Sequence, residues 1–307
     1  MPAAVDRCER MNAQRHALVT GAAGFVGQSL AAALHAAQWR VTGLDRVAPG
    51  DQSAFDGFVV CDLRDHAALE RARVEPSYDA IVHLAALLPV NARDGELLAV
   101  NAGGTSAVLD RVASAGTHVV MFSSGLVYGP QPAPFREDMP CLPSDEYGQS
   151  KLAAENIAAR WGRATRSPVA ILRPSVLYGP RAPSGMLLVS LMRALRQGEP
   201  FAMTAGEQVR DFVHVDDAVR AAMCVLEQRA EGTWNLASGE SIRVREAAEL
   251  AARIAGSPEL LRIGALPYRD TEVFDYRLNA SRLRETFAWQ PRIELAAGLR
   301  QLWEAMS

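Results

Sequence analysis

Cysteine is scarce in this sequence, and its spacing excludes several kinds of site. The chain has four cysteines, Cys8, Cys61, Cys141 and Cys224, and no two of them form a CxxC pair. The histidines form neither an HxxxH nor an HxH pair. Paired spacings of these kinds are typical of zinc sites and compact disulfide frameworks. We therefore expect no metal site, and free thiols in a reducing compartment.

Positive charge and long apolar runs are also missing. The net charge of the 307 residues is -3, whereas proteins that bind nucleic acids or anionic membranes usually carry a basic excess. No apolar run approaches the ~18 residues of a membrane-spanning helix. The first segment, MPAAVDRCERMNAQR, lacks the apolar core of a secretory signal, and we expect residues 1–14 to form a loose extension. These absences predict a cytoplasmic protein without a nucleic-acid or membrane partner.

Short apolar runs and helical patterns alternate through the first half of the chain. Strands are expected at residues 16–21, 40–45, 57–62, 79–86, 118–124 and 169–174. Helices are expected between them at residues 28–39, 64–73, 96–116 and 144–162, with Ser144 as the N-cap of the last. Such alternation is typical of a doubly wound parallel sheet. We therefore predict an α/β fold with a Rossmann-type dinucleotide-binding domain over residues 1–173.

After Arg173 the alternation gives way to a mixed pattern of helices, short strands and loops. The chain contains neither a tandem repeat nor a low-complexity linker. We predict that residues 174–307 mostly form a smaller C-terminal α/β lobe that binds substrate. Segments around residues 205–237 are expected to return to the Rossmann-type domain.

A glycine-rich turn connects the first expected strand to the first helix. In TGAAGFVGQ, Gly21, Gly24 and Gly27 have the GxxGxxG spacing of dinucleotide-binding turns. The helix that follows offers free N–H groups to a pyrophosphate. The second strand ends at Asp45, where a carboxylate accepts both adenosine ribose hydroxyls and repels a 2′-phosphate. This arrangement predicts NAD as the cofactor.

Two neighbouring residues leave alternatives open at the adenosine end. If Asp45 turned away, Arg46 would be able to hold a 2′-phosphate, so NADP stays possible. Asp62 ends the third expected strand, where it either contacts the adenine amino group or caps the next helix.

A tyrosine and a lysine in EYGQSK are candidates for proton transfer. Tyr147 and Lys151 are four residues apart on an expected helix and so share one face. A nearby ammonium stabilises tyrosinate and lowers the pKa of the phenol. Ser124, at the end of the fifth expected strand, would hold the substrate oxygen beside it. The pattern predicts that the cofactor carries hydride while Tyr147 carries the proton.

Taken together, the motifs GAAGFVG, CDL, HLAA, VNAGGT, SSGLVYG, YGQSK, LRP…YGP, RDFVHVDD and WNLASG resemble the extended short-chain dehydrogenase/reductase family. The nucleotide-sugar branch, known as NAD-dependent epimerases and dehydratases, matches best, from about His16 to the end of the chain. The resemblance implies a cofactor site that includes Gly21, Gly24, Phe25, Val26, Gly27, Asp45, Asp62, Leu63, Ala85, Ala86, Ser123, Tyr147 and Lys151. It makes Asn101 a structural or water-holding residue near the lysine.

The resemblance also implies a substrate site and a catalytic set. The catalytic residues would be Ser124, Tyr147 and Lys151. The residues in contact with the substrate would be Ser124, Gly125, Tyr147, Val176, Arg210 and Arg269. Two arginines suit the diphosphate of a nucleotide sugar, because guanidinium groups bind phosphate oxygens bidentately. Members of this family often form homodimers through helices that correspond to residues 92–115 and 144–162, so a homodimer is expected.

The residues after Ser124 discriminate between branches of this family. Dehydratases carry an Asp-Glu pair there, because elimination needs an acid and a base. This chain has Gly125 and Leu126 instead, which disfavours dehydration. Small Gly125 and the carboxylate of Asp45 favour an NAD-dependent 4-epimerase. The alternative is an NAD(P)H-dependent ketoreductase or dehydrogenase of a keto-sugar nucleotide or related polyol.

Two further observations refine this prediction. Val176 stands where many sugar epimerases carry Asn or Thr. This departure favours a deoxy- or keto-sugar nucleotide, or a substrate without a nucleotide, over a standard UDP-hexose, although Arg210 and Arg269 still favour a diphosphate. A non-catalytic sensor of the same fold is disfavoured because such proteins typically lose the tyrosine or the lysine, and Tyr147 and Lys151 are both present.

Overall fold

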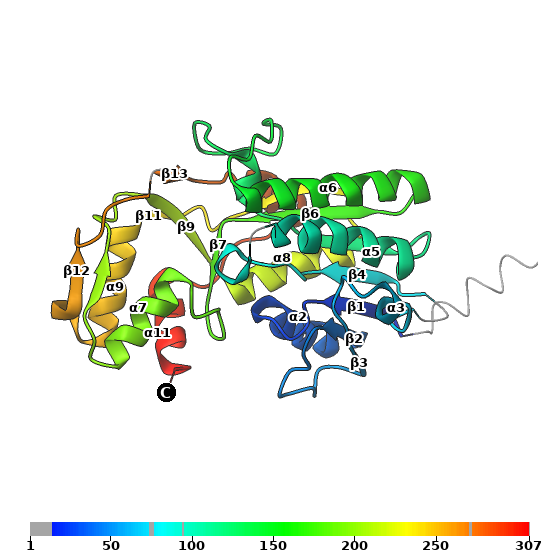
Figure 1. Ribbon diagram of the computed structural model, residues 1–307, viewed down its shortest axis with the longest axis horizontal. Helices are drawn as coiled ribbons and strands as arrows, with labels where there is room; N and C mark the ends of the chain where they lie inside the picture. The colour runs from blue at the N-terminus through cyan, green and yellow to red at the C-terminus, as the bar shows by residue number, and fades with distance from the viewer. Residues whose placement is uncertain (1–13, 74–76, 94, 270–271, 307) are drawn as a thin grey trace, which may run out of the picture.

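A parallel sheet of seven strands forms the larger part of the molecule (Figure 1). The computed structural model describes residues 14–73, 77–93, 95–269 and 272–306. Across the sheet the strand order is β10-β6-β5-β4-β1-β2-β3. The strands are β1 (His16–Thr20), β2 (Arg40–Asp45), β3 (Gly57–Val60), β4 (Ala80–His83), β5 (His118–Phe122), β6 (Val169–Pro174) and β10 (Gly232–Leu236). The prediction of a doubly wound parallel sheet is confirmed.

Helices cover both faces of this sheet. One face carries α2 (Phe25–Ala36), α8 (Val215–Glu227) and α10 (Ser281–Phe287), and the other carries α3 (His66–Glu70), α5 (Gly104–Arg111) and α6 (Glu146–Thr165). Successive residues of β1 alternate between the two cores, with Ala17 and Val19 on the α2 side and Leu18 on the α3 side. Burial on both faces explains why these strands are continuously apolar.

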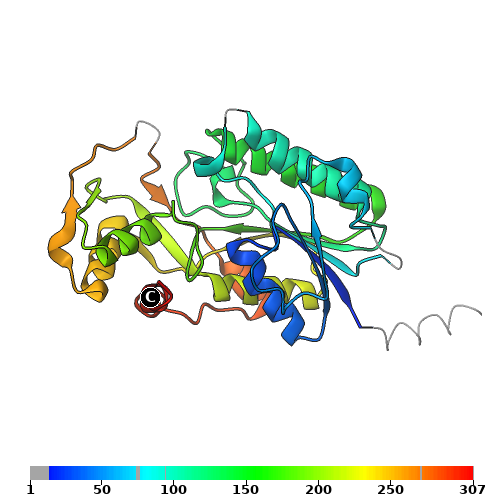
Figure 2. The same ribbon diagram turned by 60° about the horizontal axis from the view of Figure 1, so that its bottom comes forward.

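A smaller lobe lies beside the sheet domain (Figures 1 and 2). Its larger sheet contains β7 (Val176–Tyr178), β9 (Val209–His214), β11 (Ser241–Arg243) and β13 (Asp275–Tyr276). A second sheet pairs β8 (Phe201–Met203) with β12 (Leu261–Ile263), next to the short turn η4 (Pro258–Leu260). The helices α7 (Leu187–Arg196), α9 (Val244–Ala255) and α11 (Leu295–Glu304) share a core with this lobe.

The chain crosses between the two parts more than once. β9 belongs to the lobe, whereas α8 packs on α2 and β10 pairs with β6 in the large sheet. Leu283 and Phe287 of α10 lie in the same core as α2. α8, β10 and α10 thus pack with elements of the large sheet, although each follows a segment of the lobe in the chain. Among the described residues, no helix is long and apolar enough to cross a membrane.

Candidate active site

A cavity of about 1020 Å³ lies at the carboxyl ends of the parallel strands and extends to the lobe. Its size is at the upper end of the ~300–1,000 Å³ usual for ligand sites. Ligands of doubly wound sheets bind at this edge. The wall includes residues from the glycine turn, the ends of β2 to β5, the first turns of α6, and β7, β9 and β13 of the lobe.

The glycine turn has a shape that only glycine permits. Gly21 has a φ of +69°, and a Cβ there would lie 2.7 Å from the backbone nitrogen of Ala85. A Cβ on Gly27 would lie 2.2 Å from the carbonyl oxygen of Gly21. No side chain caps the first turn of α2, which follows Gly24, so its N–H groups are available to an anion. This cradle, lined also by Phe25 and Val26, fits the pyrophosphate of a dinucleotide.

Two backbone hydrogen bonds hold Asp45 on the cavity wall. Its Oδ2 accepts the Ala23 N–H at 3.0 Å, and its Oδ1 accepts the Arg46 N–H at 2.6 Å. The carboxylate is therefore tied to the glycine turn, where ribose hydroxyls would reach it and a 2′-phosphate would be repelled. Arg46 is exposed on the same wall. An NADP site would require Asp45 to break these bonds and turn away.

Asp45→Ala is expected to reduce the preference for NAD over NADP by at least about tenfold, which is ~1.4 kcal/mol. The variant removes the ribose acceptor and the repulsive charge while Arg46 remains. Isothermal titration with each cofactor measures the ratio of dissociation constants. Asp51→Ala, an exposed carboxylate away from the cavity wall, is the matched control. An unchanged ratio in Asp45→Ala would show that Asp45 does not select the cofactor.

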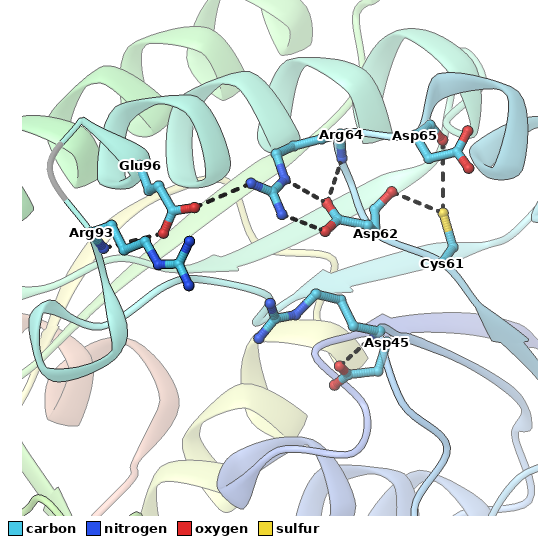
Figure 3. Close-up of polar contacts among 8 residues, drawn as sticks. Asp45, Cys61, Asp62, Arg64, Asp65, Arg93 and Glu96 are labelled. Atoms are coloured by element: carbon cyan, nitrogen blue, oxygen red, sulfur yellow. Dashed lines mark hydrogen bonds and ion pairs between the residues drawn. The ribbon is translucent and has the colours of Figure 1, made fainter.

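An ion-pair network surrounds the adenosine end of the cavity (Figure 3). The Asp62 carboxylate accepts from Arg64 Nε at 3.0 Å and from Arg64 Nη2 at 2.8 Å. These bonds lower the pKa of Asp62. Arg64 Nη1 also donates to Glu96 Oε1 of α4 (Glu96–Leu98) at 3.5 Å. Asp62 and Leu63 both line the cavity.

The capping role considered for Asp62 is wrong. α3 is capped by Asp65, whose Oδ1 accepts the Ala68 N–H at 2.9 Å. α6 likewise begins one residue later than expected, because Asp145 rather than Ser144 accepts the Gly148 N–H, at 2.7 Å. In both cases the N-cap residue lies further along the polar loop than expected. Several side chains of such a loop are able to cap the helix, and tertiary packing selects one of them.

The three predicted catalytic side chains share the cavity wall. Ser124 precedes the short turn η3 (Gly125–Tyr128), and its Oγ accepts the Leu126 N–H at 3.1 Å. Lys151 is buried and donates from Nζ to the carbonyl oxygen of Phe122 at 2.5 Å. The buried Ser123 hydroxyl has no hydrogen-bond partner among the described residues and also faces the cavity. It suits a polar group of a bound ligand.

Burial controls the titration of the tyrosine and the lysine. Burial raises the pKa of Tyr147 to about 12, and the Asp145 carboxylate contributes in the same direction. Burial lowers the pKa of Lys151 to about 8, against the opposing charge of Glu155. The expected lowering of the Tyr147 pKa is therefore not produced by the chain's own groups. It requires a further positive charge beside the phenol.

Asn101 lies behind the site rather than on its wall. It belongs to a π-helical turn, η2 (Ala99–Gly103), which with α4 (Glu96–Leu98) interrupts the single helix expected over residues 96–116. Its Oδ1 accepts the Leu87 N–H at 2.7 Å, and its Nδ2 donates to Leu87 O at 3.1 Å and to Ser150 Oγ at 2.9 Å. Leu87 lies between Ala86 and the short turn η1 (Pro89–Asn91). Asn101 therefore connects the segment after Ala85 and Ala86 to α6, which contains Ser150.

The lobe contributes the predicted substrate residues and two that were not predicted. Val176, Arg210 and Arg269 line the cavity. Arg210 Nη2 donates to Glu272 Oε1 at 2.7 Å in a mostly buried ion pair. Gly125 lies outside this wall, in a small adjoining pocket beside Tyr276. Glu272 and Tyr276 lack a recognisable motif. The pairing of β13 with β9 places Tyr276 opposite Arg210, and Glu272 forms an ion pair with the same arginine.

The sequence model of the NAD dependent epimerase/dehydratase family matches residues 17–237, which is more than half of the chain. The chain belongs to this family. The glycine turn, the strand-end Ser124 and the Tyr147–Lys151 helix all fall within the matched residues.

Relatives in the epimerase/dehydratase family extend over nearly the whole chain. The UDP-glucose 4-epimerase of Mycolicibacterium smegmatis is 31% identical over 306 residues, covering 94% of this chain and 97% of the relative. A dTDP-4-dehydro-6-deoxy-D-allose reductase of Streptomyces bikiniensis is 31% identical over 314 residues, covering 94% and 95%.

Two solved structures of NAD complexes have the same fold. MoeE5 in complex with UDP-glucuronic acid and NAD superposes with a TM-score of 0.84 at 29% identity, covering 95% of this chain and 98% of that chain. The UDP-glucose 4-epimerase of Thermus thermophilus in complex with NAD gives a TM-score of 0.83 at 27% identity, covering 94% and 98%.

Proposed function

We propose that this protein is an NAD-dependent 4-epimerase of a nucleotide sugar. The observation that carries the proposal is the make-up of one cavity wall. The glycine turn and Asp45 line it together with Ser124, Tyr147 and Lys151. The two positions after Ser124 hold glycine and leucine, so the acid and base of a dehydratase are missing there. The site therefore suits hydride and proton transfer without elimination.

The glycine turn and Asp45 would hold NAD, which when bound would supply a reversible hydride acceptor for the sugar carbon. Tyr147 takes the proton of the sugar hydroxyl at its phenolic oxygen and later returns it. Lys151 supplies positive charge near this phenol, and Ser124 holds the reacting oxygen. The positive nicotinamide ring would help to lower the pKa of Tyr147 from its raised value.

The substrate class is supported by the lobe and by the relatives. Arg210 and Arg269 line the end of the cavity formed by the lobe, where their guanidinium groups suit a diphosphate. A UDP-glucose 4-epimerase is among the relatives at 31% identity, and MoeE5 was solved with UDP-glucuronic acid and NAD. A nucleotide sugar fits both observations.

A ketoreductase is the second candidate, favoured by two specific observations. One relative at 31% identity is a dTDP-4-dehydro-6-deoxy-D-allose reductase. In addition, Val176 places an apolar side chain on the cavity wall. A reductase would use the same three side chains, but it would consume and release the reduced cofactor in each turnover.

The two candidates are separated by following isomers and cofactor in one experiment. The purified full chain is incubated with NAD and with UDP- or dTDP-linked hexoses, and products are resolved by chromatography while absorbance at 340 nm is recorded. Interconversion of C4 isomers without net NADH formation is the expected result. Stoichiometric oxidation of NAD(P)H by a 4-keto-sugar nucleotide, without isomer exchange, would replace the epimerase proposal by the reductase.

The activity is expected to decline as the pH rises through about 8, the value to which burial lowers the pKa of Lys151. Below this pH the side chain is a charged ammonium, and above it the neutral amine no longer stabilises the tyrosinate. The pH profile of kcat/KM measures this decline, which forms the alkaline limb of the profile. In Lys151→Arg the charge persists over the whole range, so any residual activity should lack the limb. Identical limbs in both proteins would assign it to another group.

We further propose that the protein forms a homodimer in the cytoplasm. Helices α5 and α6, within the predicted segments 92–115 and 144–162, pack side by side (Figure 1). Leu98 on the preceding α4 is 53% exposed, which suits an apolar contact. The described cysteines are free thiols, as a reducing compartment favours. Light scattering after size exclusion tests the dimer, and a monomer mass would contradict it.

A further inference from the structure

A run of buried hydrogen bonds connects the end of β4 to the turn η2. His83 is the last residue of β4, and its ring joins two threonine hydroxyls. Its Nδ1 lies 2.8 Å from Thr20 Oγ1, and its Nε2 lies 3.0 Å from Thr105 Oγ1. Thr20 Oγ1 also accepts the Ala85 N–H at 3.3 Å. The three side chains, which we call the histidine bridge (Thr20, His83 and Thr105), are at most 3% exposed, so water does not compete for these bonds.

The far end of the histidine bridge determines which ring nitrogen carries a proton. Thr105 Oγ1 lies 2.6 Å from the carbonyl oxygen of Asn101, and a carbonyl can only accept a hydrogen bond. The Thr105 hydroxyl therefore gives its one proton to this carbonyl and accepts the bond from His83. It follows that the imidazole is protonated on Nε2.

The near end of the bridge follows from the charge of the ring. Burial, with a contribution from the charge of Lys151, lowers the pKa of His83 to about 3. The ring is therefore neutral, and its Nδ1 is an acceptor. The Thr20 hydroxyl donates to Nδ1 and keeps a lone pair for the Ala85 N–H. Both ring nitrogens and both hydroxyls thus have a partner in one consistent direction.

Both ends of the bridge act on one segment of the cavity wall. Residues 85–87 line the cavity next to the glycine turn, and a Cβ on Gly21 would lie 2.7 Å from the Ala85 nitrogen. The side chain of Asn101 binds the N–H and the carbonyl of Leu87 at 2.7 and 3.1 Å. Asn101 therefore holds one end of the segment directly and the other end, at Ala85, through the histidine bridge.

We propose that His83 is a positioning residue for the cofactor, which holds residues 85–87 against the glycine turn through the histidine bridge. The proposal rests on the proposed function only in that the cavity binds NAD, and it is independent of the sugar reaction. A wall that is in place only part of the time weakens the apparent affinity of a ligand by that fraction. The intact bridge is thus expected to strengthen cofactor binding as well as to stabilise the sheet.

His83→Leu is the direct test, because it removes both ring nitrogens and keeps an apolar side chain in their place. We expect the dissociation constant for NAD, measured by isothermal titration, to rise about tenfold. Thr105→Val, which exchanges one hydroxyl for a methyl group, should raise it in the same direction. Thr105→Ser keeps the hydroxyl and should recover most of the affinity. The two Thr105 variants decide the question if His83→Leu does not fold.

The matched control is His16→Leu, at the opposite end of the parallel strands. His16 is the first residue of β1, is buried, and is also bound through Nε2 to a threonine hydroxyl, Thr42 Oγ1, at 2.9 Å. It is not part of the cavity wall, so the variant should unfold at lower urea but keep the wild-type affinity for NAD. Equal losses of affinity in His83→Leu and His16→Leu, or no loss in His83→Leu and Thr105→Val, would overturn the proposal. A wild type that binds no NAD would instead contradict the proposed function.

Hydrogen exchange in the protein without cofactor gives a second readout. In His83→Leu the Ala85 amide, followed by NMR, should exchange at least about tenfold faster, because its acceptor on Thr20 is no longer oriented. The Leu87 amide, which Asn101 binds directly, should exchange at the wild-type rate. Unchanged exchange at Ala85 would contradict the positioning role even if the wild type binds NAD and the sugar reaction is confirmed.

Discussion

Tyr147→Phe is expected to lower kcat by about 100- to 10,000-fold, the range that a positioned acid/base group contributes. The variant keeps the ring in the cavity wall but removes the only oxygen through which Tyr147 can take or return the proton. Cofactor binding should remain, because the glycine turn and Asp45 lie elsewhere on the wall. Steady-state kinetics and titration with NAD measure the two properties separately.

The high pKa of Tyr147 makes this test informative. Burial and the Asp145 carboxylate raise it to about 12, so the phenol enters the reaction protonated unless a positive charge is brought to it. The matched control is Tyr268→Phe, whose hydroxyl accepts the Glu207 N–H at 3.0 Å and whose side chain is not part of the cavity wall, so full activity is expected. If Tyr147→Phe kept activity within about tenfold of the wild type, proton transfer would have to be reassigned.

Arg173→Met is expected to destabilise the protein by about 3–5 kcal/mol, the typical cost of removing one partner of a buried ion pair. Arg173 Nε and Nη2 donate to the Glu155 carboxylate at 2.9 and 2.7 Å. The two side chains are 7% and 5% exposed. The guanidinium also lies 4.8 Å from the centre of the Tyr128 ring. Without Arg173, Glu155 is left as an uncompensated charge against the sheet.

Urea unfolding of the wild type and of three variants measures this effect. The single variants Arg173→Met and Glu155→Gln should both unfold at lower urea. The double variant Glu155→Gln with Arg173→Met should recover part of the loss, because no unpaired charge remains. A double variant as unstable as the sum of both single variants would show that the charges do not act as a pair.

The Arg173–Glu155 ion pair, which stabilises the fold, also influences the active site. Glu155 is on α6, one turn after Lys151, and its charge opposes the effect of burial on the pKa of that lysine. Arg173 neutralises Glu155 from β6. The sequence pattern indicated the helix and the strand but not this contact, because the two residues are 18 positions apart on different elements and no local spacing relates them.

Local chemistry explains why much of the site was predictable. Gly21, Gly24 and Gly27 lie within one strand–turn–helix unit, where the backbone geometry follows from neighbouring residues. Tyr147 and Lys151 share a face because the helix repeat places residues four apart together. Asp45 was expected at the end of a strand, and β2 does end there. Each of these inferences needs only residues that are close in the chain.

The amino-acid sequence alone determined the doubly wound fold, the family and the place of the cofactor turn, because apolar periodicity and local motifs encode them. Only the tertiary structure decided what surrounds the proposed catalytic groups. It placed the Tyr276 hydroxyl beside Gly125 and paired Glu272 with Arg210, and the residues of each pair are distant in the chain. It also decided that burial, rather than the neighbouring lysine, controls the pKa of Tyr147. These are long-range packing and desolvation effects, and no local spacing in a sequence reports them.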